Sequence, residues 1–159
     1  MKKYELTAEF IEKWGKKLFR IKALISFGSV EAGELGGYVE KEDNLAQDGD
    51  AWVYGDARVY GDAEVYGDAR VYGNADYLLI GRIGSRFSFT TFFKNKDKGI
   101  TVSCGCFLGT IAEFRAKVTD THGNNKHAKM YNLAADMAEL QILGEEHFDK
   151  LNTNKSEPF

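Results

Sequence analysis

A six-residue repeat in the middle of the chain constrains its fold more than any other feature. The hexads AWVYGD, ARVYGD, AEVYGD and ARVYGN follow one another without a gap over residues 51–74. In each hexad an alanine and a valine alternate with a variable residue and a tyrosine, which is the period-two pattern of a short strand, and the Gly-Asp pair predicts a corner. We therefore expect the alanines and valines to face one shared interior and the tyrosines to point outward.

The repeat resembles the hexapeptide repeat of left-handed parallel β-helices, in which three hexads make one triangular coil of about 18 residues. The resemblance implies that Val53 lies under Val71 and that Trp52 lies beside Arg70 in a parallel ladder. The expected fold class is thus a β-solenoid, a short left-handed parallel β-helix, followed by a small α+β domain at the C-terminal side.

A wider set of motifs carries a second resemblance. The motifs are GGYVEKEDNL at 36–45, GSR at 84–86, TTF at 90–92, CGCF at 104–107, GT at 109–110 and HG at 122–123. On these motifs and the hexads, the chain from about residue 18 to residue 131 resembles small hexapeptide-repeat proteins of phages and prophages. The resemblance implies the cytoplasm of a bacterial host as the setting. It is compatible with an anti-defence role in which the protein sequesters a host immune nucleotide.

Composition divides the chain into an N-terminal cap over 1–44, the repeat over 45–80, an α+β domain over 81–143 and a tail over 144–159. In the cap we expect a short helix or turn and then a strand, with Phe10 and Trp14 on the buried face. The tail is charged and polar, and we expect it to be frayed.

The third part shows patterns typical of three strands and two helices. Strands are predicted near 77–80, 86–93 and 100–104. A helix is predicted between Thr110, which forms a capping box with Glu113, and the pair His122 and Gly123. A second helix over about 126–143 repeats apolar residues at steps of three and four, which predicts a buried face. That face consists of Met130, Leu133, Ala134, Met137 and Leu140.

Charge and composition exclude some partners. The formal net charge is −3, so the chain has no overall cationic field for generic nucleic-acid binding. Apolar runs stay well short of the roughly 20 residues that span a bilayer, so we expect no membrane partner. Two cysteines are too few for a disulfide framework and indicate a reducing cytoplasm.

The outward tyrosines of the hexads predict self-association. An isolated monomer rarely exposes so many aromatic rings, which favours a homo-oligomer. The alternative is that flanking segments cover some of the rings. The resemblance to hexapeptide-repeat proteins implies a trimer or a multiple of it.

A basic region after the repeat predicts an anion site. Residues 77–130 hold nine Lys and Arg against three acidic residues, and a glycine-containing segment over 105–110 leads into a predicted helix N-terminus, which favours anions. One of the phenylalanines at 87, 89, 92 and 93 could stack a base. The candidate ligand-binding residues are Arg82, Arg86, Lys94, Cys106, Thr110 and His122.

The prediction is a non-catalytic oligomer that binds and sequesters a small anionic, nucleotide-like ligand, with no cofactor and no metal. An acetyl-CoA-dependent acyltransferase is an alternative that the β-helix resemblance implies, and a structural or host-protein-blocking phage protein is another. Cys104, Cys106, His122 and His127 could instead form a zinc site, although the Cys-x-Cys spacing is unusual for one. Cys106 with His122 as a base is a further alternative.

Overall fold

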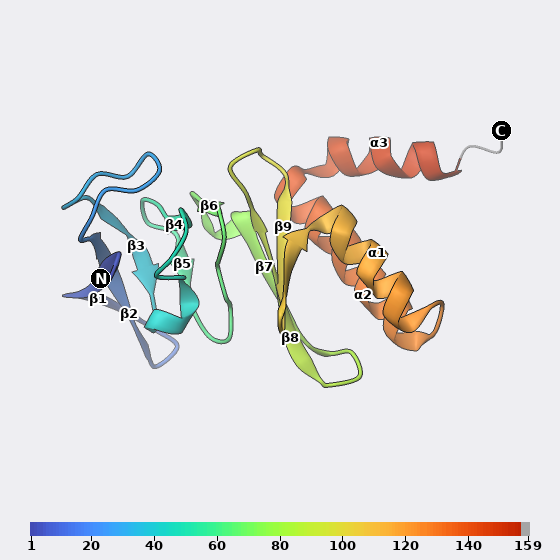
Figure 1. Cartoon of the computed structure of the whole chain (residues 1–159), viewed down its shortest axis with the longest axis horizontal. Coiled ribbons are helices and arrows are strands. Elements are labelled where there is room, and N and C mark those ends of the chain that lie inside the picture. The colour runs from blue at the N-terminus through green and yellow to red at the C-terminus, as the bar shows by residue number, and fades with distance from the viewer. Residues whose placement is uncertain (157–159) are drawn as a thin grey trace.

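The computed structural model describes the backbone of residues 1–156 and the side chains of residues 1–151. Along the long axis of the molecule an N-terminal sheet is followed by the hexads, a second sheet and the helices (Figure 1). The elements are β1 (Tyr4–Lys13), β2 (Lys16–Ala23), β3 (Leu35–Val39), η1 (Glu42–Asn44), β4 (Trp52–Val53), β5 (Arg58–Val59), β6 (Arg70–Val71), η2 (Asn74–Asp76), β7 (Tyr77–Ile83), β8 (Ser88–Lys94), β9 (Ile100–Cys104), β10 (Phe107–Thr110), α1 (Ile111–His122), α2 (Lys126–Ala138), the π-helical turn η3 (Glu139–Leu143) and α3 (Glu145–Ser156).

The predicted fold class is wrong. Over residues 1–156 the strands form three separate small sheets, ordered β1-β2-β3-β5, β10-β9-β8-β7 and β4-β6, and three α-helices follow. The second sheet is antiparallel and the first is mixed. The molecule is a small α+β protein and not a parallel β-solenoid. The hexapeptide-repeat family and the left-handed β-helix that the sequence suggested are therefore not supported.

The physical reason is that the flanking segments supply most of the ladder partners. Each strand within the hexads is two residues long. The β1–β2 hairpin extends the first sheet through β3, and on the other side of the repeat Asn95, the residue after β8, forms an isolated antiparallel bridge with Ala69. Because antiparallel hairpins close both ends of the repeat, the parallel contacts remain local.

The predicted pairing of the hexads and the predicted burial of their alanines and valines are confirmed. Val53 pairs with Val71 and Trp52 with Arg70 in parallel register. The alanines and valines of all four hexads are at most 2% exposed. Trp52, however, is completely buried because Tyr4 and Phe27 pack against it, at ring-centroid distances of 6.1 and 5.3 Å.

Glycines allow β3 to lie directly on the hexads. A Cβ at Gly37 would stand 2.5 Å from the carbonyl oxygen of Ala57 and 2.7 Å from Cγ1 of Val53. The hexad corners use another property of glycine, since Gly55, Gly61 and Gly67 all have φ between 57 and 70°. The prediction that each Gly-Asp pair makes a corner agrees with this geometry.

The N-terminal prediction is wrong for its first half. Residues 4–13 form a strand and not a helix, and Phe10 and Trp14 are 45% and 72% exposed. The strand pairs with β2 through a two-residue turn at Trp14 and Gly15. The sequence has no typical hairpin dipeptide such as Asn-Gly at this turn, so the hairpin was not predicted.

The C-terminal strands and the first helix agree with their predictions within about three residues. The predicted buried face of the second helix is wrong except for Ala134, since Met130, Leu133 and Met137 of α2 and Leu140 of η3 are 36 to 66% exposed. The buried residues of α2 are instead Ala128, Tyr131, Ala134, Ala135 and Ala138. Residues 145–156 of the predicted frayed tail form helix α3, and residues 157–159 lie outside the described part.

Strand β8 separates two hydrophobic cores. Phe93 belongs to the core shared by the hexads and the N-terminal sheet, whereas its neighbour Phe92 belongs to the core under the helices. Both side chains are fully buried, because neighbouring residues of a strand point to opposite faces. Within residues 1–156 no helix has the length and apolar character that crossing a membrane requires.

Candidate functional site

A cavity of about 290 Å³ lies between two turns of the C-terminal sheet on one side and helices α1 and α2 on the other. The turn between β7 and β8 contributes Ser85 and Arg86, and the turn between β9 and β10 contributes Cys106. Helix α1 contributes Lys117 and His122. The site is therefore built from segments that the sheet and the helices bring together, and not from the hexads.

The β9–β10 hairpin places its two cysteines differently. Cys104 pairs with Phe107, so Gly105 and Cys106 form a two-residue turn. Gly105 has φ of 59°, and a glycine with positive φ at the first position suits the tight turns of hairpins. Cys106 is consequently exposed at the turn, whereas the half-buried Cys104 accepts a hydrogen bond from Thr90 Oγ1 at 3.2 Å.

Packed aromatic rings form the wall of the cavity. Phe114 meets Phe107 at 5.8 Å and Tyr131 at 5.6 Å between ring centroids. Tyr131 in turn stacks on His122 at 5.8 Å. Each ring is held by another ring, so the wall is formed before any ligand arrives.

Gly84 lets helix α2 reach the β7–β8 turn. A Cβ at Gly84 would stand 1.8 Å from the Tyr131 hydroxyl, and the residue has φ of 83°. Burial, followed by the neighbouring Cys104, raises the pKa of the Tyr131 phenol. Tyr131 therefore stays a neutral hydroxyl that can donate a hydrogen bond at physiological pH.

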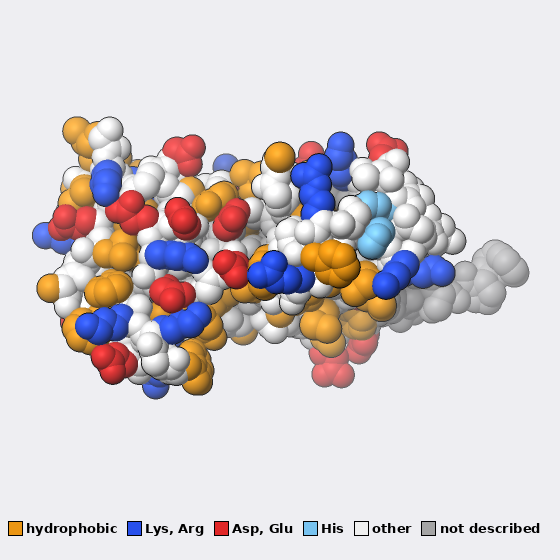
Figure 2. All heavy atoms as spheres, turned by 90° about the horizontal axis from the view of Figure 1, so that it is seen from below, with side chains coloured by type: hydrophobic (Ala, Val, Ile, Leu, Met, Phe, Trp, Pro, Cys, Tyr) orange, Lys and Arg blue, Asp and Glu red, His pale blue; other side chains and the backbone are white. Residues whose placement is uncertain are grey.

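The charged side chains at the cavity are cationic. Among the described residues, neither Arg86 nor Lys117 forms an ion pair or a hydrogen bond, and no carboxylate lines the cavity. Figure 2 shows histidine side chains at this end of the molecule with lysine or arginine side chains on both sides. Two unpaired cations beside packed rings favour a small ligand that combines negative charge with an apolar part.

Three of the six predicted site residues meet at this cavity. These are Arg86, Cys106 and His122. Arg82 does not line it and lies over the Phe89 ring, with its guanidinium carbon 5.3 Å from the ring centroid. Lys94 is at the other end of β8, where its Nζ is 3.4 Å from Asp76 Oδ1.

Thr110 is occupied as the N-cap of α1. Its Oγ1 accepts from the Glu113 backbone N–H, and its own N–H donates to Glu113 Oε1 at 2.9 Å. The backbone and side-chain hydrogen bonds of Thr110 lower the pKa of Glu113. A carboxylate already sits on this helix N-terminus, so the structure gives no support to the predicted anion site there.

The structure bears differently on the two alternatives for the cysteines, a zinc site and a nucleophile with a histidine base. Over the part of the chain that is described, no three His, Cys, Asp or Glu side chains cluster so as to hold a metal ion. His127 lies beside His122 at 5.4 Å between ring centroids, and its buried Nδ1 finds no hydrogen-bond partner among these residues. Cys106 and His122 do share the cavity, so their pairing as nucleophile and base stays a prediction.

Lys117 and Tyr131 were missed by the sequence prediction. For Lys117 a signal existed: the capping box sets the start of α1, and Phe114, Lys117, Val118 and Thr121 recur on one helix face at steps of three and four. For Tyr131 the signal was misleading, because the more apolar face of α2 was expected to be buried. Tyr131 lies on the opposite, alanine-rich face.

No protein-family model matches the chain, and no curated protein matches it significantly.

Proposed function

We propose that the protein binds a small anionic ligand with a planar, nucleotide-like part in the cavity between the two sheet turns and α1. One observation carries the proposal: Arg86 and Lys117, unpaired within the described chain, converge on a cavity walled by aromatic rings and free of carboxylates. Arginine and lysine donate charge-assisted hydrogen bonds to phosphate or carboxylate, and rings accept stacking partners.

The size of the cavity limits the ligand. Small-molecule sites are roughly 300 to 1,000 Å³, and a volume of about 290 Å³ lies at the lower end of that range. A mononucleotide or a fragment of similar size fits this limit better than a dinucleotide. The hydroxyls of Ser85, Ser88 and Thr121 add neutral donors around the cations.

Binding without turnover is part of the proposal. A histidine acting as general base needs a partner that orients its ring. The His122 ring instead stacks on Tyr131, and no hydrogen bond to it is formed within the described residues. The acyltransferase alternative rested on the β-helix resemblance, and the anti-defence setting rested on the resemblance to hexapeptide-repeat phage proteins. Neither enters the proposal, because the hexapeptide-repeat fold is not supported.

Calorimetric titration with adenosine monophosphate, adenosine and inorganic phosphate tests the proposal. We expect the monophosphate to bind more tightly than either part alone, and Arg86→Gln or Lys117→Gln to weaken it about tenfold or more, as loss of a charge-assisted hydrogen bond predicts. We expect mass spectrometry of the denatured complex to recover the ligand unchanged. The matched control is Lys96→Gln, an exposed lysine in the turn between β8 and β9 outside the cavity.

Equal affinity for the monophosphate in Arg86→Gln, Lys117→Gln and the control would remove the basis of the proposed site. Recovery of a chemically altered ligand would replace binding with catalysis and bring back the pairing of Cys106 with His122.

We also propose that copies of the chain associate through the outer face of α2 and η3. Met130, Leu133, Met137 and Leu140 form an exposed apolar stripe at steps of three and four, which a monomer rarely leaves uncovered. We expect a second copy to pack on this stripe in antiparallel orientation. In that orientation the exposed lysines at 126 and 129 of one copy face the exposed glutamates at 145 and 146 of the other.

Light scattering after size exclusion tests this association. We expect Leu133→Glu to yield monomers, and the control Asp120→Arg on the exposed surface of α1 to keep the parent mass. A parent protein that is monomeric at micromolar concentration contradicts the association.

A further inference from the structure

A second cavity, of about 410 Å³, lies at the opposite end of the C-terminal sheet and is lined by segments far apart in the chain. The β1–β2 turn contributes Trp14 and Lys16, and the second hexad contributes Arg58 and Tyr60. Asn74 and the start of β7 complete it. Its residues do not overlap with those of the first cavity.

Arg58 is a cation without a counter-charge. Its Nε atom is buried and has no hydrogen-bond partner among the described residues, and its guanidinium joins no ion pair there. A buried donor that lost its water without gaining an acceptor is costly, and native proteins rarely keep one without a use. An anionic group on a ligand would satisfy this donor and the charge together.

Trp14 has a backbone conformation and an exposure that are both unfavourable for a tryptophan. It has φ of 52° at the first position of the hairpin turn, where asparagine or glycine is usual, and it is 72% exposed. Its ring is 5.4 Å from the Tyr60 ring between centroids. A large side chain in the left-handed region that also stays in water is explained most simply by a ligand that it covers.

The other polar groups that line this cavity also favour an anionic ligand. Asn74 accepts a hydrogen bond from the Arg58 backbone N–H through Oδ1, and its amide NH₂ donates to no other residue of the described chain. Lys16 Nζ is 3.7 Å from Glu40 Oε1, a loose pair at the rim. No acidic residue is part of the lining over the described chain.

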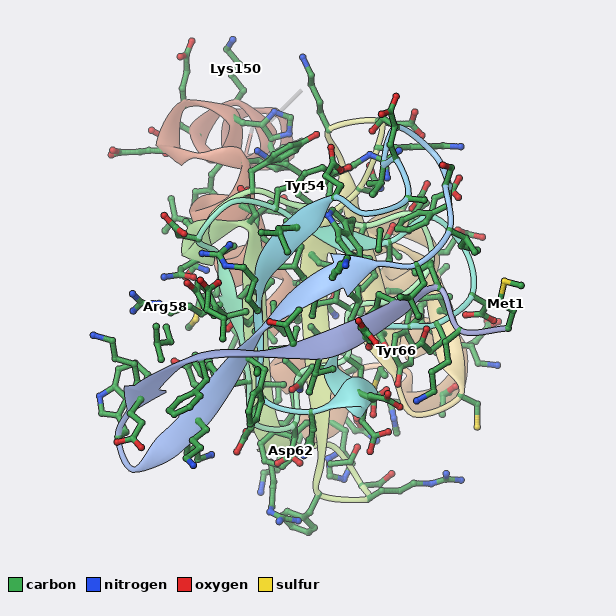
Figure 3. The ribbon with its side chains drawn as sticks, turned by 90° about the vertical axis from the view of Figure 1, so that its left-hand side faces the viewer. Met1, Tyr54, Arg58, Asp62, Tyr66 and Lys150 are labelled. Carbon is green, nitrogen blue, oxygen red and sulfur yellow. The ribbon has the colours of Figure 1, made fainter. Side chains whose placement is uncertain are left out.

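We propose that this second cavity binds a planar aromatic anion, with the ring against Trp14 and Tyr60 and the carboxylate or phosphate on Arg58. Figure 3 shows Arg58 on the side of the molecule toward which the β1–β2 turn projects. The proposal does not depend on the function assigned to the first cavity.

Calorimetry on the full chain carrying Arg86→Gln and Lys117→Gln tests this site with the first cavity disabled. Adenosine monophosphate represents the phosphate source and indole-3-acetate the carboxylate source, with adenosine as the neutral comparison. We expect at least one anion to bind more tightly than adenosine. Adding Arg58→Gln should weaken it about tenfold or more, and adding Trp14→Ala about fivefold.

Two further variants keep the test decisive. Lys13→Gln removes an exposed charge from the same hairpin outside the cavity and should change affinity less than about twofold. Trp14→Ala carries the test alone if Arg58→Gln fails to fold, since an exposed ring contributes little to the core. Absence of binding up to about 5 mM for both anions, or equal affinity in Trp14→Ala and the parent, overturns the proposal.

Discussion

The hexads and the helical end of the molecule bury their apolar residues by different rules. In the hexads each alanine and valine is buried as the local alternation predicts. In α2 the larger apolar residues point to solvent and the alanines point inward. Short strands with glycine corners set the direction of a side chain locally, whereas a helix face is chosen by whatever the helix packs against.

The packing of α2 explains why its alanine-rich face is the buried one. Alanines at 128, 134, 135 and 138 let the helix approach the sheet and α1 closely, and Tyr131 is the one large side chain that α2 packs against Phe114 within the described residues. A face of methionine and leucine would hold the helix farther away. Close approach also brings Tyr131 to Gly84, which builds the wall of the first cavity.

The largest expected effects compare the two cores. Trp52→Ala empties the core next to Tyr4 and Phe27, and Phe92→Ala empties the core under α1. Each should lower the free energy of unfolding by about 3 to 5 kcal/mol in urea titrations, because a fully buried ring is lost. A single transition by both near-UV and far-UV circular dichroism is expected in each variant, because β8 contributes to both cores. Separate transitions would show that the cores fold independently.

A smaller effect tests the close approach of β3 to the hexads. Gly37→Ala pushes a methyl group against the carbonyl of Ala57 and should cost about 1 to 3 kcal/mol. Gly73→Ala is the matched control, since no atom lies within 4 Å of its Cβ position and its φ is −151°. Its effect should stay within about 0.5 kcal/mol. Equal effects at both positions would mean that β3 does not lie against the hexads.

Lys3, which precedes β1, is hydrogen-bonded to the first hexad and makes the stability of the hexad region depend on pH. Its Nζ donates to the Ala51 carbonyl at 2.8 Å, and burial lowers its pKa to about 8. The folded state therefore releases this proton near pH 8 and the unfolded state near pH 10.5, so this residue makes stability rise with pH across that window. Tyr4 and Tyr77, whose pKa values burial raises, act in the opposite sense above about pH 10.

Lys3→Met isolates this contribution. We expect it to cost about 1 kcal/mol at pH 7, because three backbone carbonyls lose their donor while the cost of burying a charge is removed. The difference in unfolding free energy between parent and variant should grow from pH 7 to pH 9.5. A difference that stays constant with pH would assign Lys3 an unshifted pKa.

The smallest expected effect concerns the first cavity. Arg86→Gln and Lys117→Gln remove charges that have no partner within the described residues, so their unfolding free energies should match the parent within about 0.5 kcal/mol. A larger loss in denaturant titrations would indicate a structural role and weaken the ligand assignment.

The sequence allowed the register of Val53 on Val71, the capped start of α1 and the strands near 77–83 and 88–94 to be predicted, because alternation, turns and caps are local signals. It did not allow the fold class to be predicted, because the β1–β2 hairpin and the antiparallel sheet determine which strands pair. Of the first cavity, Arg86 and His122 were predictable from charge and position. Tyr131 was not, because its place depends on which face of α2 meets the sheet.

Chemical-shift mapping on the isotope-labelled full chain tests the proposed ligand site most directly. Titration with adenosine monophosphate should move the backbone amide signals of Arg86, Cys106, Lys117 and His122, while those of the buried hexad valines stay unchanged. Signals of Trp14 and Arg58 should follow a separate binding curve if the second cavity is occupied. Unmoved amides at Arg86, Lys117 and His122 under saturating ligand would contradict the assignment of the first cavity as an anion site.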